Sequence, residues 1–225
     1  MAWRDWVRTV EIEPSLYAAD FARLGDQIRD LLNGGALVFH FDVGDGHFVE
    51  PITIGPIVIQ SIAPMIHERG GVIDVHLMVD EPDKHIPQVA RAGGDSVTFH
   101  VEASGDPATT LALAREHELG AGLAFKPGTA VVDGAKAAEG ADLCLCMSIE
   151  PGYSGQQFLP EAFQRISELR ALLPDEVYVQ VDGGITFENL RQAYGAGAEL
   201  IVAGSAIFER EDLPRTYRRL VQALA

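Results

Sequence analysis

Basic residues are scarce in this chain of 225 residues. It has 17 lysines and arginines against 33 aspartates and glutamates, and its formal net charge is −16 at pH 7. Such a charge opposes binding to nucleic acid and to anionic membrane surfaces, so neither is expected as a partner. An anionic small molecule is compatible with this charge only where local hydrogen-bond donors hold it.

Long apolar runs are also absent, and cysteine is rare. No run is long enough to cross a membrane, and the first eight residues, MAWRDWVR, lack the apolar core of a signal peptide. The only cysteines are Cys144 and Cys146, which on a strand would lie about 6.5–7 Å apart, at the limit of disulfide reach. We therefore expect reduced thiols in the core of a cytoplasmic protein.

Strand-like and helix-like segments alternate along the whole chain. The predicted strands are 10–16, 37–43, 71–79, 96–103, 121–126, 143–149, 177–183 and 200–204. A helical segment follows each strand, the first over 20–32 and the last over 212–225. Eight such units predict a single-domain (β/α)8 TIM barrel over residues 1–225, with a short N-terminal extension over 1–9. An open doubly wound sheet is the alternative, but eight units in so few residues favour the barrel.

Polar side chains are predicted to collect at the carboxyl ends of these strands, where such barrels carry their chemistry. His40 and Asp42 share one face of their strand because alternate residues point the same way. The other ends supply Ser15, Asp74, His76, Met78, His100, Glu102, Lys126, Met147, Gln180 and Asp182. His40, Asp42, His76 and Asp182 match the nitrogen and oxygen ligands of a Zn, Fe or Mn site. A hydrogen-bonded His–Asp pair in a core is the structural alternative.

Glycine-bearing loops follow the last three predicted strands, over 151–156, 182–184 and 204–205. Glycine lets backbone N–H groups approach an anion, and a phosphate site after strands seven and eight is frequent in this fold. Ordinary turns are the alternative interpretation. Backbone donors would also allow an acidic protein to hold a phosphate.

Eight motifs occur in a familiar order along the chain. They are EPSLYAADFARLG at 13–25, HFDVGDGHFV at 40–49, DVHLMV at 74–79, FHVEA at 99–103, KPGT at 126–129, MSIEPGYSGQQF at 147–158, VDGGI at 181–185 and AGSAIF at 203–208. By these motifs the chain resembles the ribulose-phosphate 3-epimerase family over nearly its whole length. The resemblance implies a ribulose-phosphate-binding barrel, an isomerase of the pentose phosphate pathway, and a homo-oligomer.

The resemblance also implies roles for single residues. His40, Asp42, His76 and Asp182 would bind one divalent metal ion, either Zn, Fe(II), Mn or Co. Asp42 and Asp182 would be the catalytic acid and base that invert C3 of D-ribulose 5-phosphate through a cis-enediolate, giving D-xylulose 5-phosphate. Substrate contacts would come from Ser15, His76, Met78, Met147, Gly152, Tyr153, Ser154, Gly155, Gly183, Gly184, Gly204 and Ser205.

Several positions depart from the family pattern. Gly44 stands where methionine is usual, which predicts a looser loop, and Glu50, Pro51, Tyr153 and Ser154 also differ. These changes leave open a 3-epimerase of a six-carbon ketose phosphate such as allulose 6-phosphate, or a non-catalytic phosphate-binding barrel.

Two further questions stay open at this level. The related decarboxylase and tryptophan-pathway barrels have a lysine-centred site, for which Lys126 is the only candidate. Trp3 and Trp6 would pack either under the barrel or at a subunit contact.

Overall fold

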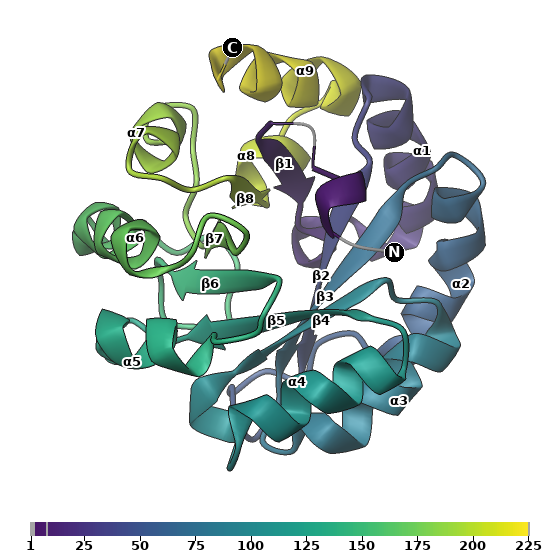
Figure 1. Ribbon diagram of the computed structural model, residues 1–225. Coiled ribbons are helices and arrows are strands. Elements are labelled where there is room, and N and C mark those ends of the chain that lie inside the picture. Colours follow the sequence, from purple (N-terminus) through teal and green to yellow (C-terminus); the bar gives the residue numbers. More distant parts are fainter. Residues whose placement is uncertain (1–2, 8, 225) are drawn as a thin grey trace.

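Eight parallel strands form the centre of the molecule, and helices surround them (Figure 1). The structure, a computed structural model, describes residues 3–7 and 9–224. The strands are β1 (Glu11–Pro14), β2 (Val38–Gly44), β3 (Val72–Met78), β4 (Ser96–His100), β5 (Gly120–Phe125), β6 (Leu143–Met147), β7 (Tyr178–Asp182) and β8 (Leu200–Ala203). They pair in the order β1-β8-β7-β6-β5-β4-β3-β2, and a bridge between Ser15 and His40 joins the two ends. The predicted barrel is confirmed, and the open doubly wound sheet is wrong.

A helix follows each strand. The helices are α1 (Leu24–Gly34), α2 (Pro56–His67), α3 (Pro82–Ala92), α4 (Pro107–Glu116), α5 (Val131–Ala137), α6 (Glu161–Leu172), α7 (Leu190–Gly195), α8 (Ser205–Phe208) and α9 (Leu213–Leu224). Within the described ranges, no helix combines the length and the apolar character needed to cross a membrane.

Local sequence explains where several helices begin and end. Pro56, Pro82 and Pro107 open α2, α3 and α4, where the fixed φ of proline suits the first turn and its missing N–H costs nothing. Gly35 and Gly93 follow α1 and α3 with φ of 99° and 95°, a conformation that glycine adopts without strain.

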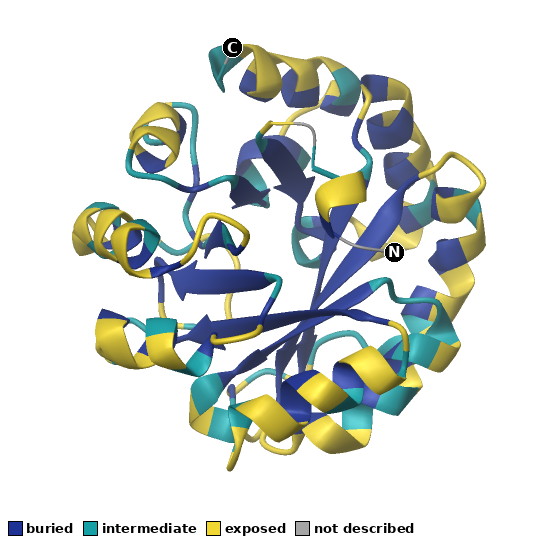
Figure 2. Cartoon of the chain, in the orientation of Figure 1, coloured by how far each residue is buried: buried dark blue, intermediate teal, exposed yellow. Residues whose placement is uncertain are grey.

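The strands are buried on both faces, whereas the helices expose their outer sides (Figure 2). Along β2, Phe39 and Phe41 point outward into the apolar layer beneath the helices, together with residues such as Ile28 of α1. Val38 points inward and belongs to a separate cluster inside the barrel. The next inward-facing residues of β2 are His40 and Asp42, which are polar. The polar groups therefore lie toward the carboxyl end of the strand.

Trp3 closes the opposite end of the barrel. Its side chain is 1% exposed and belongs to the inner cluster with Val38, Val72 and Leu143. A Cβ added at Gly120 would lie 2.9 Å from the Trp3 Nε1 atom, so glycine there makes room for the indole. Of the two sites considered for this tryptophan, the structure places it under the barrel.

Two segments near the site differ from the predicted elements. The strand predicted over 96–103 ends at His100, and Val101–Ala103 forms a 3-10 helix, η4. Glu102 therefore turns toward His100 rather than continuing along the strand, because hydrogen bonds to a neighbouring loop override the apolar alternation. Helix α8 was not predicted, since four residues carry no helical periodicity.

Candidate active site

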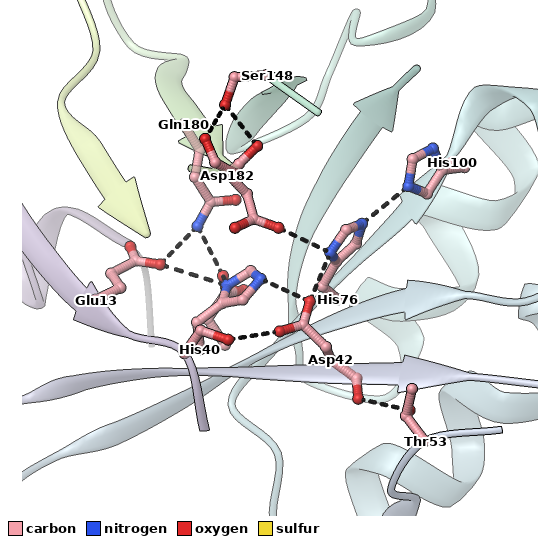
Figure 3. A network of polar contacts seen from close by, with 12 residues as sticks. Glu13, His40, Asp42, Thr53, His76, His100, Ser148, Gln180 and Asp182 are labelled. Carbon is pink, nitrogen blue, oxygen red and sulfur yellow. Dashed lines mark hydrogen bonds and ion pairs between the residues drawn. The ribbon is translucent and has the colours of Figure 1, made fainter. Parts of the chain in front are cut away.

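Two histidines and two aspartates from β2, β3 and β7 meet at the carboxyl end of the barrel (Figure 3). Ligand atoms of His40, Asp42, His76 and Asp182 all lie within 4.8 Å of one another. Asp42 Oδ1 is 3.0 Å from His76 Nδ1 and 3.3 Å from His40 Nε2. Asp182 Oδ2 is 3.9 Å from His76 Nδ1. The register that pairs Asp42 with His76 brings these side chains together across adjacent strands.

The cluster has the donor chemistry and the charge of a cation site. His40 Nε2 is buried and has no hydrogen-bond partner among the described residues, which leaves one nitrogen available as a ligand. Four carboxylates lie around His40 and His76, namely those of Glu13, Asp42, Asp74 and Asp182. Such an excess of buried negative charge is costly unless a cation balances it. Imidazole and carboxylate ligands together fit Zn, Fe(II), Mn or Co.

A second polar layer beneath the cluster orients His40. Its Nδ1 atom lies 3.0 Å from Asp74 Oδ2. The side-chain amide of Gln180 donates to Asp74 Oδ2 at 2.8 Å and to Glu13 Oε2 at 2.7 Å, and Ser96 Oγ donates to Asp74 Oδ1 at 2.6 Å. This network keeps the Nε2 edge of the His40 ring directed at Asp42.

Glu13 was missed by the sequence reasoning. A signal was present, because Glu13 lies two residues before Ser15 and therefore shares its face of the first strand. Burial raises the pKa of Glu13 from 4.5 to about 7, against the opposing effect of His40.

The two aspartates lie in different electrostatic surroundings. Burial would raise the pKa of Asp42, but the adjacent His40 and His76 imidazoles outweigh it and hold that pKa well below its usual value. Ser15 Oγ also donates to Asp42 Oδ2 at 2.8 Å. Burial and the charge of Asp42 raise the pKa of Asp182. The Asp42 carboxylate is thus stabilised as an anion, whereas the Asp182 carboxylate accepts a proton more readily.

A cavity opens above the two aspartates. It is lined by Ser15, Tyr17, Asp42, Met78, Met147, Ile149, Gly152, Tyr153, Ser154, Gly155, Asp182, Gly183, Gly184, Ile185, Val202, Gly204 and Ser205. Every predicted substrate contact is among them except His76, which lies beneath the cavity and is fully buried. Ile149, Ile185 and Val202 were not predicted.

Glycines shape one side of this cavity. Gly183 and Gly184 have φ of 117° and 64°. A Cβ at Gly183 would lie 2.3 Å from Ile149 Cγ1, and one at Gly184 would lie 2.4 Å from the Phe158 backbone nitrogen. Both positions therefore need glycine. Because none of the residues described around the cavity is lysine or arginine, backbone N–H groups and side-chain hydroxyls are the donors available to an anion there.

The loop after β2 packs tightly on Gly44, so the expectation of a looser loop is wrong. Gly44 N donates to Thr53 Oγ1 at 2.6 Å, and Thr53 N donates to Gly44 O at 3.1 Å. A Cβ at Gly44 would lie 2.9 Å from Val49 Cγ2 and 3.0 Å from Pro51 O. Glycine here lets the loop descend onto the strand.

Lys126 lies outside the cavity. Its ammonium group is 3.7 Å from the centroid of the Phe48 ring, a cation–π contact. A lysine-centred site is therefore not formed by this residue, which removes the support for the decarboxylase-type alternative.

Comparison of the sequence with known proteins points to one family. The sequence model described as the ribulose-phosphate 3 epimerase family matches residues 11–208. The chain is 39% identical to a ribulose-phosphate 3-epimerase from Escherichia coli (strain K12), over 95% of this chain and 96% of that protein. It is 38% identical to a ribulose-phosphate 3-epimerase from Bacillus subtilis (strain 168), over 90% of this chain and 94% of that protein.

Solved structures extend the likeness at the level of the fold. KGPDC from Streptococcus mutans has a TM-score of 0.72 at 13% identity, covering 96% of this chain and 98% of that one. A 3-hexulose-6-phosphate synthase has a TM-score of 0.70 at 18% identity, covering 97% of this chain and 100% of that one. At these identities the likeness concerns the barrel alone.

Proposed function

This chain belongs to the ribulose-phosphate 3-epimerase family, and from that premise we propose that it interconverts D-ribulose 5-phosphate and D-xylulose 5-phosphate. The observation that carries the proposal is the meeting of His40, Asp42, His76 and Asp182 at the floor of a glycine-walled cavity. Relatives that match it over nearly their full length carry the name of this activity.

The reaction inverts C3, whose proton is acidic because C3 lies next to the C2 carbonyl. A carboxylate is a weak base for such a proton, so the negative charge that develops on the sugar oxygens must be stabilised. A divalent cation held by His40, Asp42, His76 and Asp182 supplies that stabilisation when bound, as a Lewis acid.

Inversion needs one group to remove the C3 proton and another to return a proton to the opposite face. We assign the removal in one direction to Asp42, which its histidine neighbours and Ser15 stabilise as an anion. Asp182 lines the same cavity, and its raised pKa suits it to deliver a proton. The roles exchange in the reverse direction.

Apolar side chains keep the reacting carbon away from water. Met78 and Met147 line the cavity and are 3% and 1% exposed. In such a dry site, charge interactions are stronger than in water. The glycine-walled side of the cavity, with Ser154 and Ser205, would hold the phosphate through backbone N–H groups and hydroxyls.

The test is exchange of the C3 proton in deuterated water, followed by NMR with the metal-loaded protein and ribulose 5-phosphate. We expect deuterium at C3 together with xylulose 5-phosphate. Asp182→Asn should lower the rate by about 10²–10⁴-fold. Asp175→Asn, at an exposed loop position, is the matched control and should not change it.

Three outcomes would contradict the proposal. A wild-type rate of C3 proton exchange in Asp182→Asn would rule out the two-carboxylate mechanism. Exchange with allulose 6-phosphate but not with ribulose 5-phosphate would assign a six-carbon substrate. Absence of exchange with any ketose phosphate, despite bound metal, would assign a binding protein.

A further inference from the structure

A chain of polar side chains runs from His76 through His100 to Glu102, whose side chain is 24% exposed. Figure 3 shows the first two of these residues. His76 Nε2 lies 2.9 Å from His100 Nε2, and His100 Nδ1 lies 3.1 Å from Glu102 Oε2. Both histidines are fully buried. Neither His100 nor Glu102 lines the cavity, and the proposed reaction gives neither of them a role.

Glu102 can only accept hydrogen bonds in this setting. Its Oε1 atom accepts from the backbone N–H of Lys126 at 2.8 Å and from the hydroxyl of Thr129. Its Oε2 atom must then accept from His100, so the proton of the His100 ring lies on Nδ1. These hydrogen bonds also lower the pKa of Glu102 to about 2, outweighing the effect of its burial.

The direction of donation between the two rings follows from this tautomer. A neutral imidazole with its proton on Nδ1 has a bare Nε2, which can only accept. The His76 Nε2 atom must therefore carry the proton of that ring and donate it to His100. The remaining nitrogen, His76 Nδ1, faces Asp42 Oδ1 at 3.0 Å and would keep its lone pair for a cation when one is bound.

We propose that His100 and Glu102 are positioning residues that hold His76 in the one tautomer able to bind the cation through Nδ1. The proposal rests on the metal site of the proposed function. His40 is oriented directly by a carboxylate, because Asp74 Oδ2 lies 3.0 Å from His40 Nδ1. His76 is oriented indirectly, because it contacts His100, which in turn contacts the carboxylate of Glu102.

The surrounding side chains keep this chain in place. The His100 ring stacks on His76 with centroids 5.0 Å apart, and Phe48 covers it with a centroid distance of 4.8 Å. Arg165 donates to the carbonyl oxygens of Lys126 and Thr129 at 3.1 Å and 2.8 Å, which anchors the loop that fixes Glu102. The 3-10 turn after β4 is what returns Glu102 to His100.

Glu102→Gln tests the proposal with almost no change of shape. The glutamine oxygen can still accept from Lys126 and Thr129, but its NH2 group would face His100 Nδ1 and donate to it. The donation would then run in the opposite direction and place a proton on His76 Nδ1. Zn²⁺ alone is the probe, titrated in competition with a chromophoric chelator, and we expect the Kd to rise about 10–100-fold.

Nitrogen-15 chemical shifts of the imidazole rings in the metal-free protein report which ring nitrogen carries a proton, independently of the Zn²⁺ titration. His76 Nε2 should carry a proton in the wild type and none in Glu102→Gln. His100→Phe, which removes the acceptor, should also weaken Zn²⁺ binding, whereas His100→Gln should restore much of it. Glu176→Gln is the matched control, because Glu176 is exposed in the loop before β7 and the change of side chain is the same.

A wild-type Kd in Glu102→Gln, or an unchanged His76 tautomer, would overturn the proposal. Equal losses in the two His100 variants would overturn it as well, since packing rather than donation would then matter. If only the proposed enzymatic function were wrong, the wild type would bind Zn²⁺ and carry a proton on His76 Nε2, yet it would not exchange the C3 proton of the sugar.

Discussion

Gly44, the last residue of β2, offers the sharpest test of how the mouth of the barrel is built. The family resemblance points to methionine at this position, whereas the structure leaves no room for it. An added Cβ would lie 2.9 Å from Val49 Cγ2, 3.0 Å from Pro51 O and 3.1 Å from Thr53 Cγ2. The Pro51 oxygen belongs to the backbone, so Gly44→Met must displace the segment 49–53.

The size of the effect follows from these contacts. Overpacking of a filled site costs roughly 1–3 kcal/mol. For a chain of this length each kcal/mol lowers Tm by roughly 2–4 °C, so a decrease of roughly 2–12 °C is expected. Val49 and Pro51 also pack against Gly152, where a Cβ would meet them at 3.3 Å and 3.4 Å. The displacement should therefore reach the glycine wall and raise KM for ribulose 5-phosphate more than it lowers kcat.

Thermal unfolding and steady-state kinetics on the same preparations measure both effects. Gly105→Met is the matched control, because an added Cβ at Gly105 would meet no atom of residues 3–7 and 9–224 within 4 Å. Its Tm and its KM should equal those of the wild type. If Gly44→Met kept the wild-type Tm, the tight packing of the loop on Gly44 would be refuted.

Three other predictions test the electrostatics, the barrel floor and the lysine alternative. Glu13, with its pKa raised from 4.5 to about 7, contributes stability that is complete below pH 4.5 and lost as pH rises through 7. Urea unfolding of the metal-free protein should therefore show a decrease on the order of 3 kcal/mol from this group, and Glu13→Gln should abolish it. Trp3→Ala, which empties the floor of the barrel, should lower the free energy of unfolding by about 3–5 kcal/mol, whereas a change below about 1 kcal/mol would contradict the packing described. Lys126→Met should keep C3 exchange within about tenfold of the wild type, because the ammonium group lies over Phe48 and outside the cavity, and complete loss would revive a lysine-centred reaction.

The sequence by itself determined the architecture and the inner cluster of two histidines and two aspartates. Alternating segments predicted the eight strand and helix units, because burial on both faces of a parallel strand leaves a continuous apolar run. The two-residue repeat of a strand placed His40 and Asp42 on one face, and position at the strand end predicted His76 and Asp182. These features depend on neighbours within a few residues, which a sequence displays directly.

Only the tertiary structure decided which groups support that cluster. Gln180 donates to Asp74, a residue 106 positions away, and to Glu13, 167 positions away. The chain leaves its strand after His100 and returns Glu102 to it, and this turn depends on hydrogen bonds from the loop after β5. Such contacts follow from strand register and from the closure of the barrel. These arise from the packing of all eight units at once, so no local pattern could have predicted them.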